Sequence, residues 1–167
     1  LHEFDTISPK KLHEIQNERL RVLMDRCYRD IPYYRDLFDK NGIKPKHIQT
    51  TDDLIRVPFT EKKDLRSLYP YGLLGVPLER IFRFAASSGT TGVPTLVGFT
   101  WKDWMETLRE QMGRIFNAMG FRRGDLIYQC TGYALFMGGP GMEAGAEAVG
   151  AVLFPVGPGR TLAGIQY

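Results

Sequence analysis

The sequence predicts an α/β fold, with a helical N-terminal region over residues 1–80 and part of a mixed or parallel sheet with crossover helices over residues 81–167. Two observations lead to this fold class. Apolar residues recur at helical spacing through the first forty residues and again from Trp101 to Met119. Further along, short apolar runs at 126–130 and 151–155 enclose a stretch of helical length. A strand, a helix and a strand at this spacing are typical of a parallel crossover unit.

Composition narrows the class of protein. The chain has 167 residues, of which 43% are hydrophobic and 25% charged, which is ordinary for a globular protein with its own core. Cys27 and Cys130 are the only two cysteines, and their separation in sequence fits neither a disulfide framework nor a metal-ligand motif. Such cysteine usage is typical of a reducing compartment, so we expect a cytoplasmic protein. No apolar run approaches the ~20 residues that span a bilayer. A membrane is therefore not expected as a partner. A nucleic acid is not expected either, because the net charge of +3 is small and scattered and forms no basic stripe.

The N-terminal region reads as a series of capped helices. Ser8 is a suitable N-cap and Pro9 suits the first helical position. Pro32 interrupts the pattern, which resumes and ends at Asn41-Gly42. Thr50 or Thr51, and later Thr60, precede short charged stretches that we expect to be brief helices. Nothing here looks catalytic, and we interpret the region as an amphipathic cap over a core.

The second region opens with two predicted strands, at 81–85 and 95–99, joined by a polar loop. A regular helix should follow, begun by Thr100 with Asp103 as a capping pair and ended by Gly120. Its two tryptophans are expected to pack between elements rather than to contact a ligand. After the strand at 126–130, a glycine-rich loop at 138–141 is expected to lead into a helix that runs to about Val149.

The loop from Ser87 to Thr95 carries the most chemical information. It contains two serines, three threonines and two glycines but no acid, so its backbone and hydroxyls can converge on an anion such as a phosphate chain. It is not a P-loop, because no lysine follows the glycines and Pro94 leads into a strand. The residues alone leave a simple hairpin turn as the alternative.

Several motifs in order resemble one enzyme family. Ser-Ser-Gly-Thr-Thr-Gly-x-Pro-Thr resembles the phosphate-binding loop of the adenylate-forming acyl-CoA synthetases. The segments 59–66, 69–73, 132–139 and 145–151 resemble the phenylacetate-CoA ligase branch of that superfamily. The similarity runs from about Tyr28 to the C-terminus. It implies the N-terminal subdomain of an aryl-acid CoA ligase.

The resemblance implies a reaction in two halves, with ATP, Mg²⁺ and coenzyme A as co-substrates and cofactor. A carboxylate attacks the α-phosphate of ATP, and the thiol of coenzyme A then displaces AMP from the acyl-adenylate. The resemblance assigns the β- and γ-phosphates to Ser87, Ser88, Gly89, Thr90, Thr91, Gly92 and Thr95. The family usually has lysine where this chain has Val93, so ATP binding should be weaker or depend more on backbone donors.

The resemblance also implies an acid-binding cavity walled by Tyr133 and Phe136, with Gly138 and Gly139 allowing the backbone to approach the ligand. Aromatic walls suit an aryl ring. The alternative is that both aromatic side chains simply fill a core. Glu147 faces the nucleotide cleft or, as we favour, is a solvated helix residue. The sequence assigns no catalytic residue and no metal ligand.

Family members are more than twice as long as this chain, so we expect a fragment that has no ligase activity alone. Its expected partners are a small aryl carboxylic acid and the missing C-terminal part of the enzyme. The segment 126–167 is rich in glycine and poor in charge, and we expect its apolar end to be covered by a second copy of the chain or partly disordered. Two alternatives remain. One is a catalytically inactive nucleotide-binding or interaction module, and the other is an adenylate-forming enzyme for a different acid or a cofactor.

Overall fold

The computed structural model describes residues 6–87, 92, 94–160, 162 and 165. The chain divides into two compact units, residues 1–78 and residues 79–167, and each is described by itself. The sequence-based assignment of these regions as a helical cap and a nucleotide-binding subdomain stays a prediction.

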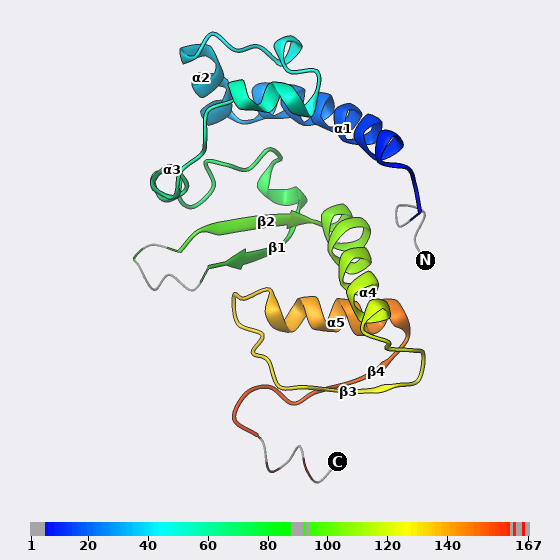
Figure 1. The fold of residues 1–167 in the computed structure, drawn as a ribbon. Helices are drawn as coiled ribbons and strands as arrows, with labels where there is room; N and C mark the ends of the chain where they lie inside the picture. The colour runs from blue at the N-terminus through cyan, green and yellow to red at the C-terminus, as the bar shows by residue number, and fades with distance from the viewer. Residues whose placement is uncertain (1–5, 88–91, 93, 161, 163–164, 166–167) are drawn as a thin grey trace. The chain divides into compact units, whose positions relative to one another are not determined.

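The first unit is helical (Figure 1). It contains α1 (Pro9–Asp30), α2 (Pro32–Lys40) and α3 (Lys62–Ser67), together with the 3₁₀ helices η2 (Pro45–His47) and η3 (Thr51–Arg56). The Ser8 hydroxyl accepts a hydrogen bond from the Lys11 backbone N–H at 3.2 Å, which confirms the predicted cap of the first helix. The interruption at Pro32 is also confirmed, because α1 and α2 are separated by Ile31 alone.

Carboxylate side chains accept hydrogen bonds at the N-termini of the two short helices η3 and α3. At η3, Asp53 accepts from the backbone N–H of Thr50 at 2.9 Å, so the predicted start at this threonine is confirmed. At α3, the N-cap is Glu61 rather than Thr60, and Asp64 accepts from the Glu61 N–H at 2.8 Å. The Thr60 hydroxyl instead donates to the Tyr34 hydroxyl at 3.3 Å. A carboxylate accepts from N–H groups more strongly than a hydroxyl does, which favours the start at Glu61.

The core of the first unit lies between α1, α2 and the segment that follows α2. Its buried residues are Leu20, Met24, Phe38, Ile43 and Ile48. Phe38 and Ile48 are almost completely buried. The amphipathic spacing predicted for the first forty residues therefore corresponds to an enclosed apolar cluster.

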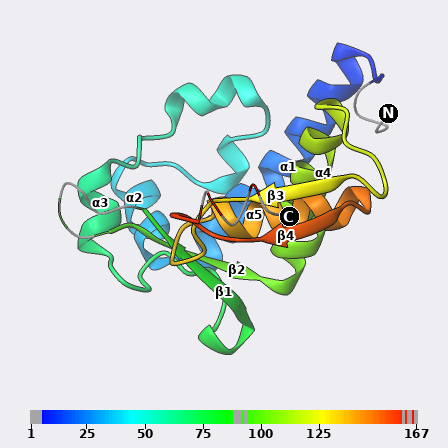
Figure 2. The ribbon, with the colours of Figure 1, turned by 90° about the horizontal axis from the view of Figure 1, so that it is seen from below.

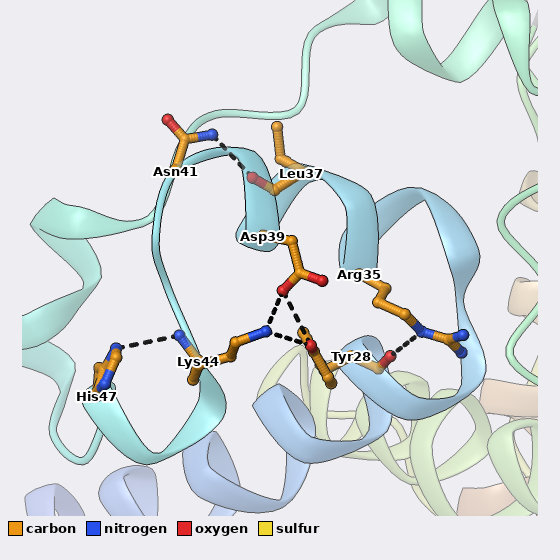
Figure 3. A network of polar contacts seen from close by, with 7 residues as sticks. All are labelled: Tyr28, Arg35, Leu37, Asp39, Asn41, Lys44 and His47. Carbon is orange, nitrogen blue, oxygen red and sulfur yellow. Dashed lines mark hydrogen bonds and ion pairs between the residues drawn. The ribbon is translucent and has the colours of Figure 1, made fainter.

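A polar network ties α2 to α1 at the edge of this core (Figure 3). The Tyr28 hydroxyl donates to Asp39 Oδ1 at 2.9 Å and accepts from Lys44 Nζ at 2.6 Å. Lys44 Nζ also donates to Asp39 Oδ1 and lies 4.8 Å from the centroid of the Tyr28 ring. The hydrogen bond from Arg35 Nε to the Tyr28 carbonyl, at 3.0 Å, adds a second link between the helices.

The second unit begins with the antiparallel hairpin of β1 (Ile81–Ala86) and β2 (Leu96–Thr100). Both predicted strands are confirmed, displaced by no more than one residue at either end. The Thr100 hydroxyl donates to Asp103 Oδ2 at 2.7 Å, and the Asp103 N–H donates back to the Thr100 hydroxyl at 3.2 Å, so the predicted capping pair is confirmed as well.

The helix after the hairpin is not uniformly α-helical, and this corrects the sequence-based expectation. Residues Asp103–Leu108 form the π-helical segment η5, and α4 (Arg109–Ala118) continues from it. The Arg109 N–H bonds to the Trp104 carbonyl, one residue further back than in an α-helix. Trp104 is buried within this wider turn, and its ring meets Phe82, Phe99 and the Arg83 guanidinium.

A parallel crossover unit completes the fold, as predicted. β3 (Leu126–Gln129) pairs in parallel with β4 (Val152–Pro155), and α5 (Gly138–Val149) connects them. Figures 1 and 2 both draw α5 alongside this pair of strands. The glycine-rich stretch at 138–141 is the first turn of α5 and not a loop, which corrects the prediction. The buried face of α5 packs so close to α4 that a Cβ on Gly145 would lie 2.8 Å from the Phe116 ring, and such close packing favours small residues. With both sheets in view, the predicted α/β class is confirmed.

Candidate functional site

The predicted phosphate loop, residues 87–95, is closed at its base, the stem of the hairpin, by two hydrogen bonds between its first and last residues. The Ser87 N–H donates to the Thr95 carbonyl at 3.0 Å, and the Thr95 N–H donates to the Ser87 hydroxyl at 2.9 Å. Of the predicted phosphate-binding residues, Ser88, Gly89, Thr90 and Thr91 lie outside the described residues, as does Val93. Gly92 has φ of +125°, a backbone conformation that other residues rarely adopt.

The second predicted segment lies against this stem. We call residues 130–137, between β3 and α5, the aromatic loop. The Ala86 N–H, at the last residue of β1, donates to the Leu135 carbonyl of the aromatic loop at 2.8 Å. Ala86 directly precedes Ser87. The fold therefore brings the start of the predicted phosphate loop next to the segment predicted to hold the acid.

The two aromatic residues of the aromatic loop have different environments. Tyr133 is partly buried, and its hydroxyl donates to Gln129 Oε1 at 2.8 Å. Burial raises the pKa of the Tyr133 phenol, and the negative charge of Glu143 raises it further. The phenol is therefore neutral at pH 7 and able to donate. Phe136 is 48% exposed, so it does not fill the core of this unit.

Gln129 is a residue that sequence reasoning missed. It is the last residue of β3, is only 3% exposed and is the buried polar residue of the described core. Its Nε2 donates to the Gly139 carbonyl at 2.9 Å and to the Thr131 hydroxyl at 3.0 Å. The available signal was an amide at an inward position of an otherwise apolar strand, since buried polar groups need partners.

The two glycines predicted to line the acid cavity differ in their surroundings. A Cβ on Gly139 would lie 2.5 Å from the Gly132 carbonyl oxygen, whereas a Cβ on Gly138 would meet nothing within 4 Å. Gly139 thus allows the first turn of α5 to pack against the backbone of the aromatic loop. Contact of either glycine with a ligand stays a prediction. Glu147 is exposed on α5, as expected for a solvated helix residue.

The described residues form neither a candidate metal centre nor a membrane-spanning helix. No group of three or more His, Cys, Asp or Glu side chains that could hold a metal ion was found among the residues that the structure describes. Over the same residues, no helix combines the length and the apolar character needed to cross a membrane.

No protein-family model matches the chain, but several curated enzymes are similar to it in sequence. Phenylacetate-coenzyme A ligase of Thermus thermophilus is 45% identical over 159 residues, which cover 95% of this chain and 36% of the relative. The enzyme of the same name from Aromatoleum evansii is 41% identical over 99% of this chain and 38% of its own length. The Escherichia coli enzyme is 38% identical over 96% of this chain and 37% of its own length.

A solved structure supports the same relationship. The 2-hydroxyisobutyryl-CoA ligase crystallised with 2-HIB-AMP and coenzyme A superposes with a TM-score of 0.84 at 32% identity, over 92% of this chain and 33% of that chain. These findings confirm the predicted resemblance. The chain is a relative of the phenylacetate-CoA ligases and spans between 36% and 38% of their length.

Proposed function

We propose that this chain is the part of an aryl-acid CoA ligase that holds the ATP phosphates and the carboxylic acid. The observation that carries the proposal is the hydrogen bond from the Ala86 N–H to the Leu135 carbonyl. It joins the strand that leads into the phosphate loop to the loop that carries Tyr133 and Phe136. Two co-substrates that react with each other must be held side by side, and this contact supports such an arrangement.

In the first half of the reaction, a carboxylate oxygen attacks the α-phosphorus of ATP. The bond from that phosphorus to the β-bridging oxygen breaks, and pyrophosphate leaves. The serine and threonine hydroxyls of Ser87–Gly92 and Thr95, together with the backbone N–H groups of residues 88–92, would hold the β- and γ-phosphates and stabilise the charge on the leaving group. The N–H groups of Ser87 and Thr95 are already engaged in the hairpin stem. In the second half, the thiolate of coenzyme A attacks the acyl carbon and AMP departs.

Mg²⁺ would supply charge neutralisation to the phosphates in such a reaction. The described residues offer no acidic cluster for this ion, and we assign it no ligand in this chain. The chain's own part in the chemistry is donation from neutral groups, orientation of the acid, and apolar contact with an aryl ring through Tyr133 and Phe136.

The test is ATP–pyrophosphate exchange driven by phenylacetate. Residues 1–167 replace the matching portion of the Thermus thermophilus phenylacetate-coenzyme A ligase, and the hybrid should catalyse exchange. The isolated 167 residues should not, because the rest of the ligase length is absent. A hybrid that folds and releases no pyrophosphate would contradict the proposal, and so would robust turnover by the isolated chain.

A second candidate, a nucleotide-binding module without catalysis, is favoured by one observation, which is Val93 at a position where the family usually has lysine. Calorimetry of the hybrid with ATP and Mg²⁺, combined with the pyrophosphate-exchange assay, separates the two functions. A ligase should bind ATP and should bind it more tightly after Val93→Lys, by about tenfold for one added charge–phosphate contact. Binding without pyrophosphate exchange would favour the module.

A further inference from the structure

We propose that Gln129 is a positioning residue for the acid-binding site, holding Tyr133 and the start of α5 in one arrangement. The inference rests on the proposed function, because it assumes that the aromatic loop contacts the acid. It adds a residue that neither the sequence motifs nor the comparisons single out.

The Gln129 side chain engages both of its N–H donors and its carbonyl oxygen with residues close to the site. Both N–H groups of Nε2 are engaged, one with the Gly139 carbonyl at 2.9 Å and the other with the Thr131 hydroxyl at 3.0 Å. Its Oε1 accepts from the Tyr133 hydroxyl at 2.8 Å. Among neutral side chains, only an amide offers two donors and an acceptor in one plane. An apolar or acidic residue at position 129 would therefore lose at least one of these hydrogen bonds.

The Gln129 backbone fixes the base of this arrangement. Its carbonyl accepts from the N–H groups of Val156 at 3.0 Å and Gly157 at 3.1 Å, which come directly after β4. The side chain therefore extends from a point held by both parallel strands. Because it is only 3% exposed, water does not compete for its partners.

The aromatic loop depends on this anchor. A separate backbone hydrogen bond, from the Ala86 N–H to the Leu135 carbonyl, ties the aromatic loop to the hairpin. At Gly139 the loop lies so close to α5 that no Cβ would fit. Glu143 lies within hydrogen-bonding reach of the Tyr133 hydroxyl. Beyond burial, both its charge and this contact raise the pKa of the phenol, so a hydroxyl released from Gln129 would turn to that carboxylate. We therefore expect loss of the amide to move the Tyr133 ring and, with it, one wall of the acid pocket.

The first experiment follows the surroundings of the Tyr133 phenol and the protection of the aromatic loop in the isolated chain. The Tyr133 Cζ resonance of the ¹³C-tyrosine-labelled protein is assigned by its loss in Tyr133→Phe, and is then followed in Gln129→Met. We expect this resonance to move and the amides of residues 130–139 to exchange faster with solvent. The control is Gln111→Met, the same substitution at an exposed position of α4. An unmoved Tyr133 resonance in folded Gln129→Met would overturn the proposal.

If circular dichroism shows that Gln129→Met fails to fold, Gln129→Glu takes its place. The carboxylate keeps an acceptor for the Tyr133 hydroxyl but has no N–H for the Gly139 carbonyl. We expect the Tyr133 resonance to stay close to its original position while amide exchange in residues 130–139 accelerates. Exchange unchanged from the parent chain would overturn the proposal.

The second experiment measures selectivity in the hybrid ligase. Gln129→Met and Tyr133→Phe should each raise KM for phenylacetate about tenfold, the size of one lost hydrogen bond, while KM for ATP stays within about twofold. The double variant should resemble Gln129→Met, because that substitution already removes the one hydrogen bond that Tyr133→Phe removes. An additive increase of about a hundredfold would show that Gln129 acts independently of Tyr133. Lack of exchange in the unsubstituted hybrid would count against the proposed function alone, since the tyrosine resonance still decides the positioning.

Discussion

The two units differ in how their apolar cores are enclosed. In the first unit, side chains from α1, α2 and the following segment surround Ile48, which is fully buried. In the second unit, helices cover one face of the parallel pair, where Ile127 is 7% exposed, while Leu126 on the opposite face is 68% exposed. Parallel sheets in α/β proteins normally have both faces covered.

The uncovered face forms a continuous apolar surface. Val152 and Phe154 of β4 lie on it beside Leu126, and the Tyr128 and Phe154 rings stack at 6.1 Å. A recess of about 180 Å³ next to these rings is lined by Tyr128, Phe154, Pro155 and Val156. The contrast indicates that helices surround the core of the first unit, whereas the core of the second unit lies between α4, α5 and one face of the parallel pair. That a second copy of the chain covers the apolar C-terminal part of this unit stays a prediction.

The largest effect should come from the cluster that holds the second unit together. Phe116 is 1% exposed, packs on Phe121 at 5.1 Å between ring centroids, and lies against Gly145 of α5. Phe116→Ala should lower the free energy of unfolding by about 3–5 kcal/mol, measured by urea denaturation. Met119→Ala, at a mainly exposed position of the same helix end, should change it by less than about 0.5 kcal/mol. Similar losses in both variants would mean that the α4–α5 cluster is not the core of this unit.

The next effect concerns the close approach at the start of α5. Gly139→Ala places a methyl group 2.5 Å from the Gly132 carbonyl oxygen, so backbone must move, and we expect a loss of about 1–3 kcal/mol. Gly138→Ala meets no atom within 4 Å and serves as the control. Thermal melting of the two variants makes the comparison. Equal melting temperatures would contradict the packing role of Gly139.

A smaller effect is expected on the open face of the sheet. Leu126→Ser removes an apolar side chain that is already mainly in solvent, and should change the free energy of unfolding by less than about 0.5 kcal/mol. The adjacent Ile127→Ser removes a buried side chain and should be strongly destabilising. If Leu126→Ser is as damaging as Ile127→Ser, the face is covered in solution, for example by a second copy of the chain, which sedimentation would detect.

Local patterns in the sequence predicted elements well and their environments less well. The caps at Ser8 and at Thr100 with Asp103 were predictable because each depends on residues within three positions of one another. The start at Glu61 was missed because a neighbouring carboxylate competes with Thr60 for the same role. The π-helical turn at Trp104 was missed because it depends on ring contacts with β1 and β2, which spacing within one helix does not reveal.

The candidate site illustrates the same limit. Motif order predicted the phosphate loop and the aromatic loop as separate segments, but not the Ala86–Leu135 bond that joins them, since those residues are far apart in sequence. Gly138 and Gly139 looked equivalent in sequence. Only at Gly139 would an added Cβ collide with the backbone of the aromatic loop. Gln129 was overlooked because its partners lie in the irregular loop that follows it and at the start of α5, where no repeating pattern in the sequence indicates which side chains meet.

The smallest effect is expected at the polar network of the first unit, and it should depend on pH. Hydrogen bonds from Lys44 first, and then from Tyr28, lower the pKa of the Asp39 carboxyl below its usual value. A carboxyl whose folded-state pKa is lowered stabilises the fold above its unfolded pKa of about 3.9, and this contribution is lost as the pH falls through the folded-state value. Asp39→Asn should therefore melt slightly below the parent chain at pH 7, and the two should converge in acid.

Because the Asp39–Lys44 pair is at the surface, solvent and salt weaken it, so the difference at pH 7 should also shrink when salt is added. Asp36→Asn removes an exposed carboxylate from the same helix and controls for the change in net charge. Melting curves of the three proteins across the acid range make the measurement. A difference between Asp39→Asn and the parent chain that widens as the pH falls would have the wrong sign, and would mean that Asp39 is not held in its charged form by Lys44 and Tyr28.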